Sequence, residues 1–456
     1  MESRSQSLRH DQGIDLDAAL HKIAWRIVPI LFIAYIVSFV DRINVGFAQT
    51  AMKTDLGFGP AVYGLAAGAY ALGYCLFEVP SNLLVDRVGA RKTFTRIMVC
   101  WGVVSAYTFV VKQPWQFYTL RFVLGLFEAG FFPGIVLYLT FWFPSEARAR
   151  MLSWFFVGGA LAGVFGGIAS GIIMQTFGGI AGLHGWQWMF LLEGLPAIII
   201  GLFVWFYLPD SPQMARWLTH AEKQAVLELL TADRVAHEGA SHHSFVEALK
   251  NPHVYAFIAV YFLLACGSYA IPYWLPVIIQ DAGVHAPFAI GAYSAIPYGI
   301  GAIGIALISR HSDKVRERRW HYSLCAFFGA CGLGVISVPF GSLPITLTLM
   351  GITVALVLGS IPVFWALPPK YLGRGGALAG GIALISSIGS LGGFVSPYVI
   401  GLAWQTTGSM VFGIGAMAVL LAISSVILLV TTRDTTGADG AIDPILNPRE
   451  SKNAST

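Results

Sequence analysis

Long apolar runs recur along the chain and are separated by short polar segments. Twelve of these runs approach or exceed the length of about 20 residues that a helix needs to cross the hydrocarbon core of a bilayer. They lie near 25–50, 62–84, 93–111, 115–142, 150–176, 187–208, 253–279, 288–309, 320–339, 344–367, 374–404 and 408–431. The pattern predicts an all-α membrane protein with twelve transmembrane helices.

The composition agrees with this prediction. Hydrophobic residues make up 56% of the 456 residues and charged residues 11%, whereas a soluble domain carries about 25% charged residues. The mean hydropathy is +0.68. The five cysteines all lie within apolar runs, which argues against a disulfide framework and against a spaced metal site. Residues 1–24 are polar, mixed in charge and without a signal-peptide pattern.

The basic residues indicate which ends of the runs share a side of the membrane. The two tails and every second connection, together with the run ends beside them, hold 24 of the 28 lysines and arginines; the other connections hold only Lys53 and Lys112, and Arg42 and Arg121 lie deep inside runs. By the positive-inside rule, we expect a multi-pass protein of the cell (inner) membrane with both termini in the cytoplasm. Since this distribution explains the net charge of +4, the charge does not indicate a nucleic-acid partner.

The second half of the chain repeats the first. Asp86 and Asp313 lie in similar basic connections 227 positions apart, and Gly64 and Gly291 keep the same offset. The repeat predicts two six-helix bundles, 25–208 and 253–432, joined by a cytoplasmic linker, 209–252, and flanked by cytoplasmic tails, 1–24 and 433–456. Parallel repeats of this kind are a known transporter design.

Ionisable residues inside the runs are the candidate functional groups, because such residues are costly in a bilayer and mark functional sites. The stretch RFVLGLFEAGFFPG places Arg121 and Glu128 seven residues apart, on one face of a single expected helix. Asp41 and Arg42 lie in the first run. An arginine stays charged and matches a carboxylate, and a carboxyl group removed from water can take up and release a proton near neutral pH.

These properties suggest a division of roles. We expect Arg42 and Arg121 to bind the anionic substrate, with Arg121 paired to Glu128 and exchanging partners as the proton moves. Asp41 and Glu128 would carry protons. A purely structural salt bridge between Arg121 and Glu128 is the alternative, and the roles of Glu78 and Glu193, which also lie inside runs, stay open.

Several motifs, in order along nearly the whole chain, resemble the major facilitator superfamily. The connection 82–92 reads NLLVDRVGARK and is similar to the superfamily's loop motif, although Asn82 replaces the usual leading glycine and one extra residue precedes the basic pair. The stretches DRIN at 41–44, RFVLGLFEAGFFPG followed by FWFP, and GWQWMFLLEG narrow the resemblance to the anion:cation symporter family of organic-anion transporters.

The resemblance implies a site and a conformational latch. The family's coupling acids and arginines fall on Asp41, Arg42, Arg121 and Glu128, and family members use positions matching Tyr74 and Trp365 for substrate contact. Ser386 and Ser390 stand where the family usually has asparagines, which suggests a larger or less hydroxylated ligand. Tyr273, an amphipathic aromatic beside a proline in the seventh run, is a further candidate contact. The implied latch, which would hold the start of the eleventh run near Gly375, consists of Asp86, Arg87, Arg91 and, in the repeat, Asp313.

The expected function is import of a small organic anion by symport with protons, through alternating access of the two bundles. Candidate substrates are sugar acids, tartrate-like dicarboxylates and aromatic carboxylates. The proton gradient drives transport, so no cofactor is expected; the protein would work as a monomer in the lipid bilayer and would not be an enzyme. The chain contains no Gly-Lys pair, which excludes the phosphate-binding loop of an ATP-driven pump.

Two alternatives remain open. The chain could be an organic-anion exchanger or facilitator on the same fold, or a membrane receptor that transports nothing. The exchanger-associated motif of the superfamily carries a proline after its glycines in the fifth run. Residues 158–167 read GGALAGVFGG without that proline, which favours symport.

Overall fold

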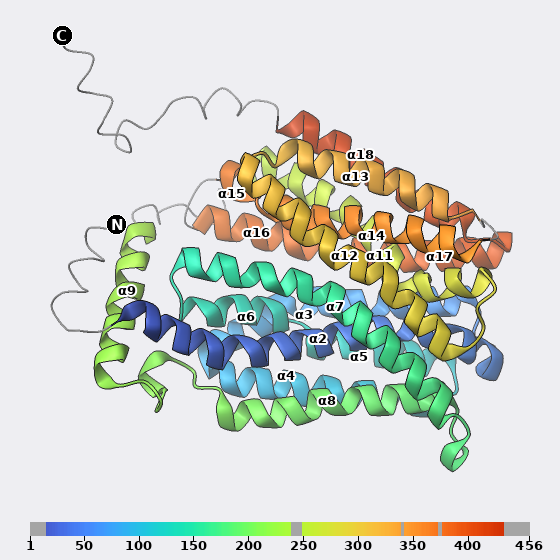
Figure 1. Cartoon of the computed structure of the whole chain (residues 1–456), viewed down its shortest axis with the longest axis horizontal. Helices are drawn as coiled ribbons and strands as arrows, with labels where there is room; N and C mark the ends of the chain where they lie inside the picture. Colours follow the sequence, from blue (N-terminus) through green and yellow to red (C-terminus); the bar gives the residue numbers. More distant parts are fainter. Residues whose placement is uncertain (1–14, 239–248, 339–341, 373–375, 433–456) are drawn as a thin grey trace, which may run out of the picture.

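A computed structural model describes residues 15–238, 249–338, 342–372 and 376–432, and every regular element in these ranges is a helix (Figure 1). The N-terminal bundle consists of α2 (Leu16–Leu56), α3 (Pro60–Val88), α4 (Ala90–Tyr107), α5 (Pro114–Glu128), α6 (Phe131–Thr140), α7 (Ser145–Phe177) and α8 (Gly185–Tyr207). The C-terminal bundle consists of α11 (Pro252–Asp281), α12 (Pro287–Val315), α13 (Arg319–Ile336), α14 (Leu343–Trp365), α16 (Gly376–Gly389), α17 (Gly392–Thr407) and α18 (Val411–Thr431).

Short elements connect these helices. They are η1 (Thr108–Val110), η2 (Ile180–Gly182), η3 (Pro212–Met214) and α15 (Pro368–Tyr371). The helix α9 (His220–Glu238) follows α8 and lies at one end of the molecule, across the start of α2 (Figure 1). We call this end the linker side and the opposite end, where α2 finishes and α3 begins, the far side.

Eleven helical segments of the described residues are long and apolar enough to cross a membrane. The expected ninth span is α13, which packs between α14 and α18 but begins with the polar sequence Arg-Trp-His. These three residues lower its mean hydropathy and leave it outside that group. With α13 included, the chain has the expected twelve-helix fold in two six-helix bundles.

Two of the expected spans are not single helices. The fourth is divided into α5 and α6, because Ala129 has an extended ψ of 135° and Gly130 a left-handed φ of 82°. A side chain on Gly130 would be strained at this φ and would meet Ser81 at 2.5 Å. The eleventh span is divided into α16 and α17 at Ser390 and Leu391. The expectation of one continuous helix through Glu128 was therefore wrong.

Helix α9 is attached to the N-terminal bundle by polar contacts. The Lys22 ammonium of α2 donates to Glu222 Oε2 at 3.0 Å, and the Thr219 backbone N–H donates to the same oxygen at 2.7 Å. Burial acts to raise the pKa of Glu222, but the Thr219 N–H and the Lys22 charge together hold that pKa below its ordinary range. Helix α9 of the linker is therefore fixed to the first span, α2.

Three helix pairs make the most extensive contacts between the two bundles: α2 with α11, α3 with α17, and α7 with α12; α3 also contacts α16. In Figure 1 the N-terminal bundle (blue to green) lies below the C-terminal bundle (yellow-green to red). The contacts between glycine backbones, such as Gly167 with Gly291 and Gly64 with Gly401, lie toward the far side. Tyr63 Oη also donates to the Tyr273 carbonyl at 2.9 Å. The bundles are therefore closely packed at the far side.

Candidate functional site

A pair of opposite charges lies inside the N-terminal bundle. Arg42 Nη2 of α2 contacts Glu128 Oε1 at 2.5 Å, and Ser38 Oγ, one turn earlier in α2, donates to the same oxygen at 2.9 Å. Glu128 is the last residue of α5 and is fully buried. Three rings surround the Arg42 guanidinium, those of Phe39, Tyr70 and Tyr74, with centroids 4.7, 5.4 and 5.3 Å from Cζ.

Arg121 is held differently. Its guanidinium donates to two consecutive backbone carbonyls of α2, those of Asp41 at 3.3 Å and Arg42 at 3.4 Å, and its Cζ lies 5.1 Å from the Tyr70 ring. The side chain is 1% exposed. The sequence predicted that Arg121 pairs with Glu128. In this conformation that pairing was wrong, because Glu128 at the end of α5 faces Arg42.

Asp41 is buried among neutral donors. Trp101 Nε1 donates to its Oδ2 at 3.0 Å and Ser105 Oγ to its Oδ1 at 2.5 Å, both from α4. Its carboxylate is not in any ion pair of the described residues. The four expected ionisable residues are thus brought together on α2 and α5, with two distinct environments for the two acids.

Several polar atoms of this cluster are buried without a hydrogen-bond partner. They are Glu128 Oε2, Arg42 Nε, Arg121 Nε, the Tyr70 hydroxyl and the Tyr273 hydroxyl. An unpaired buried donor or acceptor costs about 1–3 kcal/mol. The unpaired Nε atoms of the two arginines can therefore still donate to an anion, and the unpaired oxygen of Glu128 can still accept a proton.

The expected substrate contacts of the C-terminal bundle lie on α11, at the end of α14, and on or directly after α16. Tyr273 is fully buried in α11, with its ring 6.2 Å from that of Tyr269. Trp365 ends α14, and its ring lies 4.8 Å from the Tyr261 ring. Ser390 follows α16, and its N–H donates to the Ser386 carbonyl at 2.9 Å.

Glu78 and Glu193 occupy different places. Glu78 of α3 accepts from Ser386 Oγ of α16 at 3.2 Å, so it contacts the opposite bundle. Glu193 of α8 accepts from Ser170 Oγ of α7 at 2.6 Å, within its own bundle. Oε2 of each glutamate is buried without a partner.

The expected latch is described only in part. The side chain of Asp86 and residue Gly375 lie outside the described residues. Arg87 is exposed, and the Arg91 backbone N–H donates to Asp210 Oδ1 at 2.8 Å. In the repeat, Asp313 is paired with Arg318 of its own connection. The predicted latch stays a prediction.

Sequence reasoning missed the residues that hold the charges in place. In the cluster these are Ser38, Tyr70, Trp101 and Ser105. Outside the cluster, Asp210 accepts a hydrogen bond from the backbone at the start of α4. For Ser38, Trp101 and Ser105 the sequence does contain a signal, the four-residue spacing along a helix. Ser38 precedes Arg42 by four residues, and Trp101 precedes Ser105 by four, so each pair shares a helix face. Asp210 lies after α8, and nothing local in the sequence relates it to residue 91.

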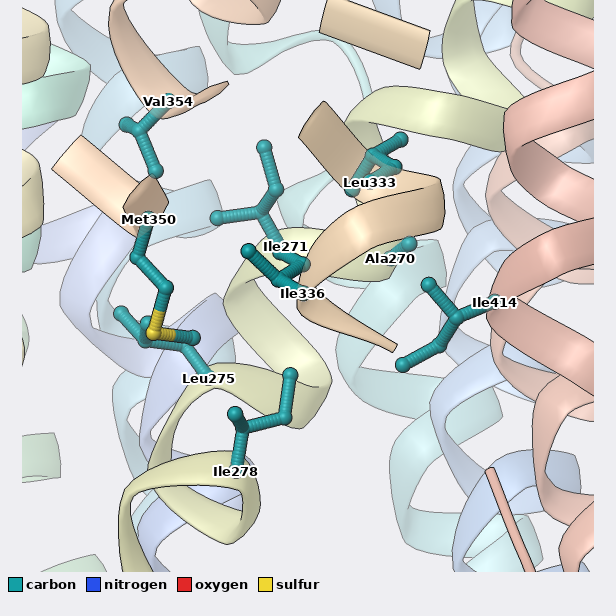
Figure 2. Close-up of a pocket in the computed structure, with 9 residues that line it drawn as sticks. All are labelled: Ala270, Ile271, Leu275, Ile278, Leu333, Ile336, Met350, Val354 and Ile414. Carbon is teal, nitrogen blue, oxygen red and sulfur yellow. The ribbon is translucent and has the colours of Figure 1, made fainter. Parts of the chain in front are cut away.

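Two other possibilities for a site can be set aside. Among the described residues no group of three or more His, Cys, Asp or Glu side chains is arranged to hold a metal ion. A cavity of about 10 Å³ lies inside the C-terminal bundle, and Figure 2 shows that all nine side chains lining it are apolar. A void of this size and lining stays dry and offers nothing to an anion.

Comparison with known proteins agrees with the fold and the motifs. Residues 31–397 match the Major Facilitator Superfamily. The chain is 42% identical over 433 residues to a protein of Agrobacterium vitis provisionally named a tartrate transporter, covering 93% of this chain and 97% of the relative. It is also 42% identical over 393 residues to NicT of Pseudomonas putida, provisionally named a metabolite transport protein, covering 86% and 89% of the two chains.

Among solved structures, the chain resembles an inward-open conformation of the xylose transporter XylE from Escherichia coli. The TM-score is 0.71 at 14% identity, with 91% of this chain and 97% of that chain covered. This likeness shows the fold alone. Together with the matched residues and the relatives, it shows that the chain belongs to the major facilitator superfamily and is a multi-pass membrane transporter, not an enzyme.

Proposed function

We propose that the protein imports a small organic anion, a carboxylate, together with protons. Arg42 and Arg121 would attract the carboxylate, and Glu128 and Asp41 would carry protons. The observation that carries the proposal is the buried pair of Arg42 and Glu128, with one unpartnered oxygen on Glu128 and an unpartnered Nε on each arginine. The name of the Agrobacterium vitis relative, a tartrate transporter, supports an organic acid as the substrate.

Charge balance gives the physical reason for coupling. When all four residues are ionised, two positive charges of Arg42 and Arg121 balance two negative charges of Asp41 and Glu128. An entering carboxylate adds one negative charge to a site with little water, which is costly unless a proton arrives with it. Protonation of Glu128 would release Arg42 from its ion pair and make the guanidinium available to the substrate.

The bundles 25–208 and 253–432 would rock around this site as two units. We place the linker side in the cytoplasm of a cell with an inner membrane, because the basic residues gather in the connections on that side. In this topology the far side faces outward, and the packed far-side contacts support an inward-facing state. Asp86, Arg87 and Arg91, with Asp313, are proposed as the latch of the opposite state, and a single chain as the functional unit.

Uptake into proteoliposomes tests the proposal. Purified protein would be offered a panel of carboxylates, with and without an inward proton gradient. We expect accumulation of at least one acid above its equilibrium level only when the gradient is present. Uptake that merely equilibrates would favour a facilitator, uptake that requires an internal anion would favour an exchanger, and binding without uptake would favour a receptor.

The substitution Glu128→Gln tests the proton-carrying role. We expect it to abolish accumulation driven by the proton gradient, because the amide cannot take up the proton. Exchange of labelled for unlabelled substrate should continue, since it needs no net proton movement. The matched control is Glu228→Gln on the exposed face of α9, which should leave both activities unchanged. Gradient-driven accumulation by the Glu128→Gln variant would contradict the assignment.

A further inference from the structure

Glu78 is a buried carboxyl group at the junction of the two bundles. Its side chain is 6% exposed, although no cation lies within ion-pair distance of it among the described residues. Ser386 Oγ of the opposite bundle donates to Oε1 at 3.2 Å, whereas Oε2 has no partner. An ordinary structural role would satisfy both oxygens, because a buried acceptor without a donor is costly.

The position of Glu78 relates it to the charged cluster. Tyr70, Tyr74 and Glu78 follow one another at four-residue spacing on α3 and therefore share one face of that helix. The Tyr74 ring lies 5.3 Å from Arg42 Cζ. Four residues of helix rise by about 6 Å. Glu78 thus lies one helical turn beyond the guanidinium, toward the linker side.

The C-terminal bundle completes the surroundings of Glu78. Cys75, three residues before Glu78, donates its thiol to the Ser387 carbonyl of α16 at 3.0 Å. The carboxyl group of Glu78 therefore lies where α3 meets α16, beside Ser386, a position that the sequence analysis related to the substrate.

We propose that Glu78, positioned by Ser386, accepts a hydrogen bond from the substrate, at the end opposite to the carboxylate held by Arg42 and Arg121. The substrate class is then an organic acid that carries, besides this carboxylate, a hydrogen-bond donor such as a hydroxyl or an ammonium group. This inference rests on the proposed function. It differs from the expectation from sequence, in which Ser386 and Ser390 suggested a larger or less hydroxylated ligand. The Ser386 hydroxyl donates to Glu78, and the free oxygen of Glu78 is the acceptor that the proposal assigns to the substrate.

The arrangement discriminates against acids without a donor. An aromatic or purely aliphatic carboxylate has no hydrogen-bond donor to offer and would leave Glu78 Oε2 unpaired. A site that hydrogen-bonds a substrate hydroxyl rejects the analogue that lacks it, because the polar group of the site then stays buried without a partner. For one hydrogen bond to a charged group the expected discrimination is roughly tenfold or more.

Four-carbon acids that differ at one position provide the test. Succinate has no donor between its carboxylates, malate has one hydroxyl, tartrate has two, and aspartate has an ammonium group. Initial uptake rates in proteoliposomes would be measured for each acid at equal concentration. We expect malate, tartrate or aspartate to exceed succinate by roughly tenfold or more. Glu78→Ala should bring the preferred acid and succinate to similar rates.

A second variant separates the two kinds of donor. Glu78→Gln keeps a neutral acceptor and removes the charge, so it should retain a preference for a hydroxyl and lose a preference for the ammonium of aspartate. Ser386→Ala should weaken the discrimination without abolishing uptake, since it only frees the Glu78 side chain. Thermal unfolding of each purified variant shows whether it is folded, and Glu228→Gln serves as the unaffected control.

Three outcomes would overturn the inference, and a fourth concerns the proposed function. Equal rates for succinate and the donor-bearing acids in the unmodified protein would exclude an acceptor role. So would a Glu78→Ala variant that keeps the full discrimination. Loss of gradient-driven accumulation in Glu78→Gln, with exchange and selectivity intact, would identify a proton carrier instead. Absence of uptake for every carboxylate tested would reject the proposed function itself.

Discussion

Arg42 and Arg121 both lie against the Tyr70 ring, but their guanidinium groups have different partners. Arg42 faces a carboxylate, whereas Arg121 spans two backbone carbonyls of α2. A backbone carbonyl does not titrate, so the two hydrogen bonds of Arg121 do not depend on the protonation state of the acids. We therefore expect Arg42 to be the arginine whose partner changes in the proposed proton cycle.

The substitution Arg121→Lys tests this difference. A lysine has a single ammonium group on a flexible stem and cannot reproduce the planar fork that reaches both carbonyls. We expect a loss of about 2 kcal/mol, the cost of one charge-assisted hydrogen bond. The loss would be measured as a fall of a few degrees in the unfolding temperature of the purified protein.

Arg42→Lys is the matched comparison. The ammonium can still pair with Glu128, so the unfolding temperature should change less than in Arg121→Lys, while the affinity for the carboxylate falls. The reverse order of the two unfolding temperatures would show that Arg42 is the structural arginine.

At this scale the sequence predicted which ionisable residues gather but not how they pair. Asp41, Arg42, Arg121 and Glu128 stand out because ionisable residues are rare in apolar runs. Their pairing depends on where each helix ends and how it is rotated. Glu128 faces Arg42 because α5 stops at that residue, and a periodicity argument that assumes a continuous helix cannot find this.

Helices α3 and α5 approach each other closely, and this contact sets the position of the aromatic residues around the arginines. Gly125 of α5 lies directly against the Tyr70 carbonyl of α3, and Gly73 of α3 lies directly against the Phe122 carbonyl of α5. Small residues at such reciprocal positions let two helices pack backbone to backbone in a membrane. The Tyr70 ring is thereby placed next to both guanidinium groups.

Gly125→Ala should separate the two helices. The added methyl group would overlap the Tyr70 carbonyl, which belongs to the backbone and cannot turn away. We expect the overpacking to cost about 1–3 kcal/mol and to reduce transport strongly. Thermal unfolding and uptake would be measured together. The control is Gly415→Ala in α18, where a methyl group meets nothing within 4 Å, and which should stabilise the helix slightly. Wild-type uptake by the Gly125→Ala variant would show that this contact does not set the site.

At the scale of elements, the length of the apolar runs predicted where the helices lie, but it did not predict that two of the runs are divided into two helices. In the run 115–142 the break directly follows Glu128, and in the run 374–404 it falls at Ser390 and Leu391. The residues on both sides of each break are mostly apolar, so the hydropathy reads as continuous. Gly130 could be a packing glycine or a glycine with a positive φ, and the sequence contains both kinds. The structure shows that it is both, because its φ is 82° and a side chain there would meet Ser81 of α3.

The two bundles are bridged at the far side by three glutamine side chains, one each at the pairs α7–α12, α3–α17 and α2–α11. Gln175 of α7 accepts from the Phe288 N–H of α12 at 3.2 Å, and Gln405 of α17 accepts from the Ala61 N–H of α3 at 3.1 Å. Gln280 of α11 accepts from the Thr50 hydroxyl of α2.

Two of these bridges repeat each other across the halves of the molecule. Ala61 and Phe288 are 227 positions apart, the same offset as Asp86 and Asp313. Each is the second residue of its helix, after a proline, and its N–H would otherwise lack an intrahelical partner. The capping group comes from the opposite bundle in both cases, so opening the far side uncaps two helices.

We expect the double variant Gln175→Ala, Gln405→Ala to shift the conformational equilibrium away from the closed far side. Neutral exposed hydrogen bonds are worth about 0.5–1 kcal/mol each, so the combined shift is a few-fold to tenfold. Hydrogen exchange of the purified protein would measure it. Amides at the far-side starts of α3 and α12 should exchange faster, and amides at the linker-side ends of α3 and α7 should become more protected, because rocking closes one side as it opens the other.

The slower exchange at the linker side distinguishes gating from simple loss of a cap. The chain offers matched controls: Gln116 and Gln187 are also far-side glutamines, but they accept from Gln113 N–H and His184 N–H within their own bundle. Gln116→Ala and Gln187→Ala should speed exchange only near the lost cap. If the double variant also changes exchange only near Ala61 and Phe288, the interbundle glutamines cap helices without holding the far side closed. Protection that rises at the linker side in the double variant alone would identify the two bridges as a symmetric gate, built without a single charged residue.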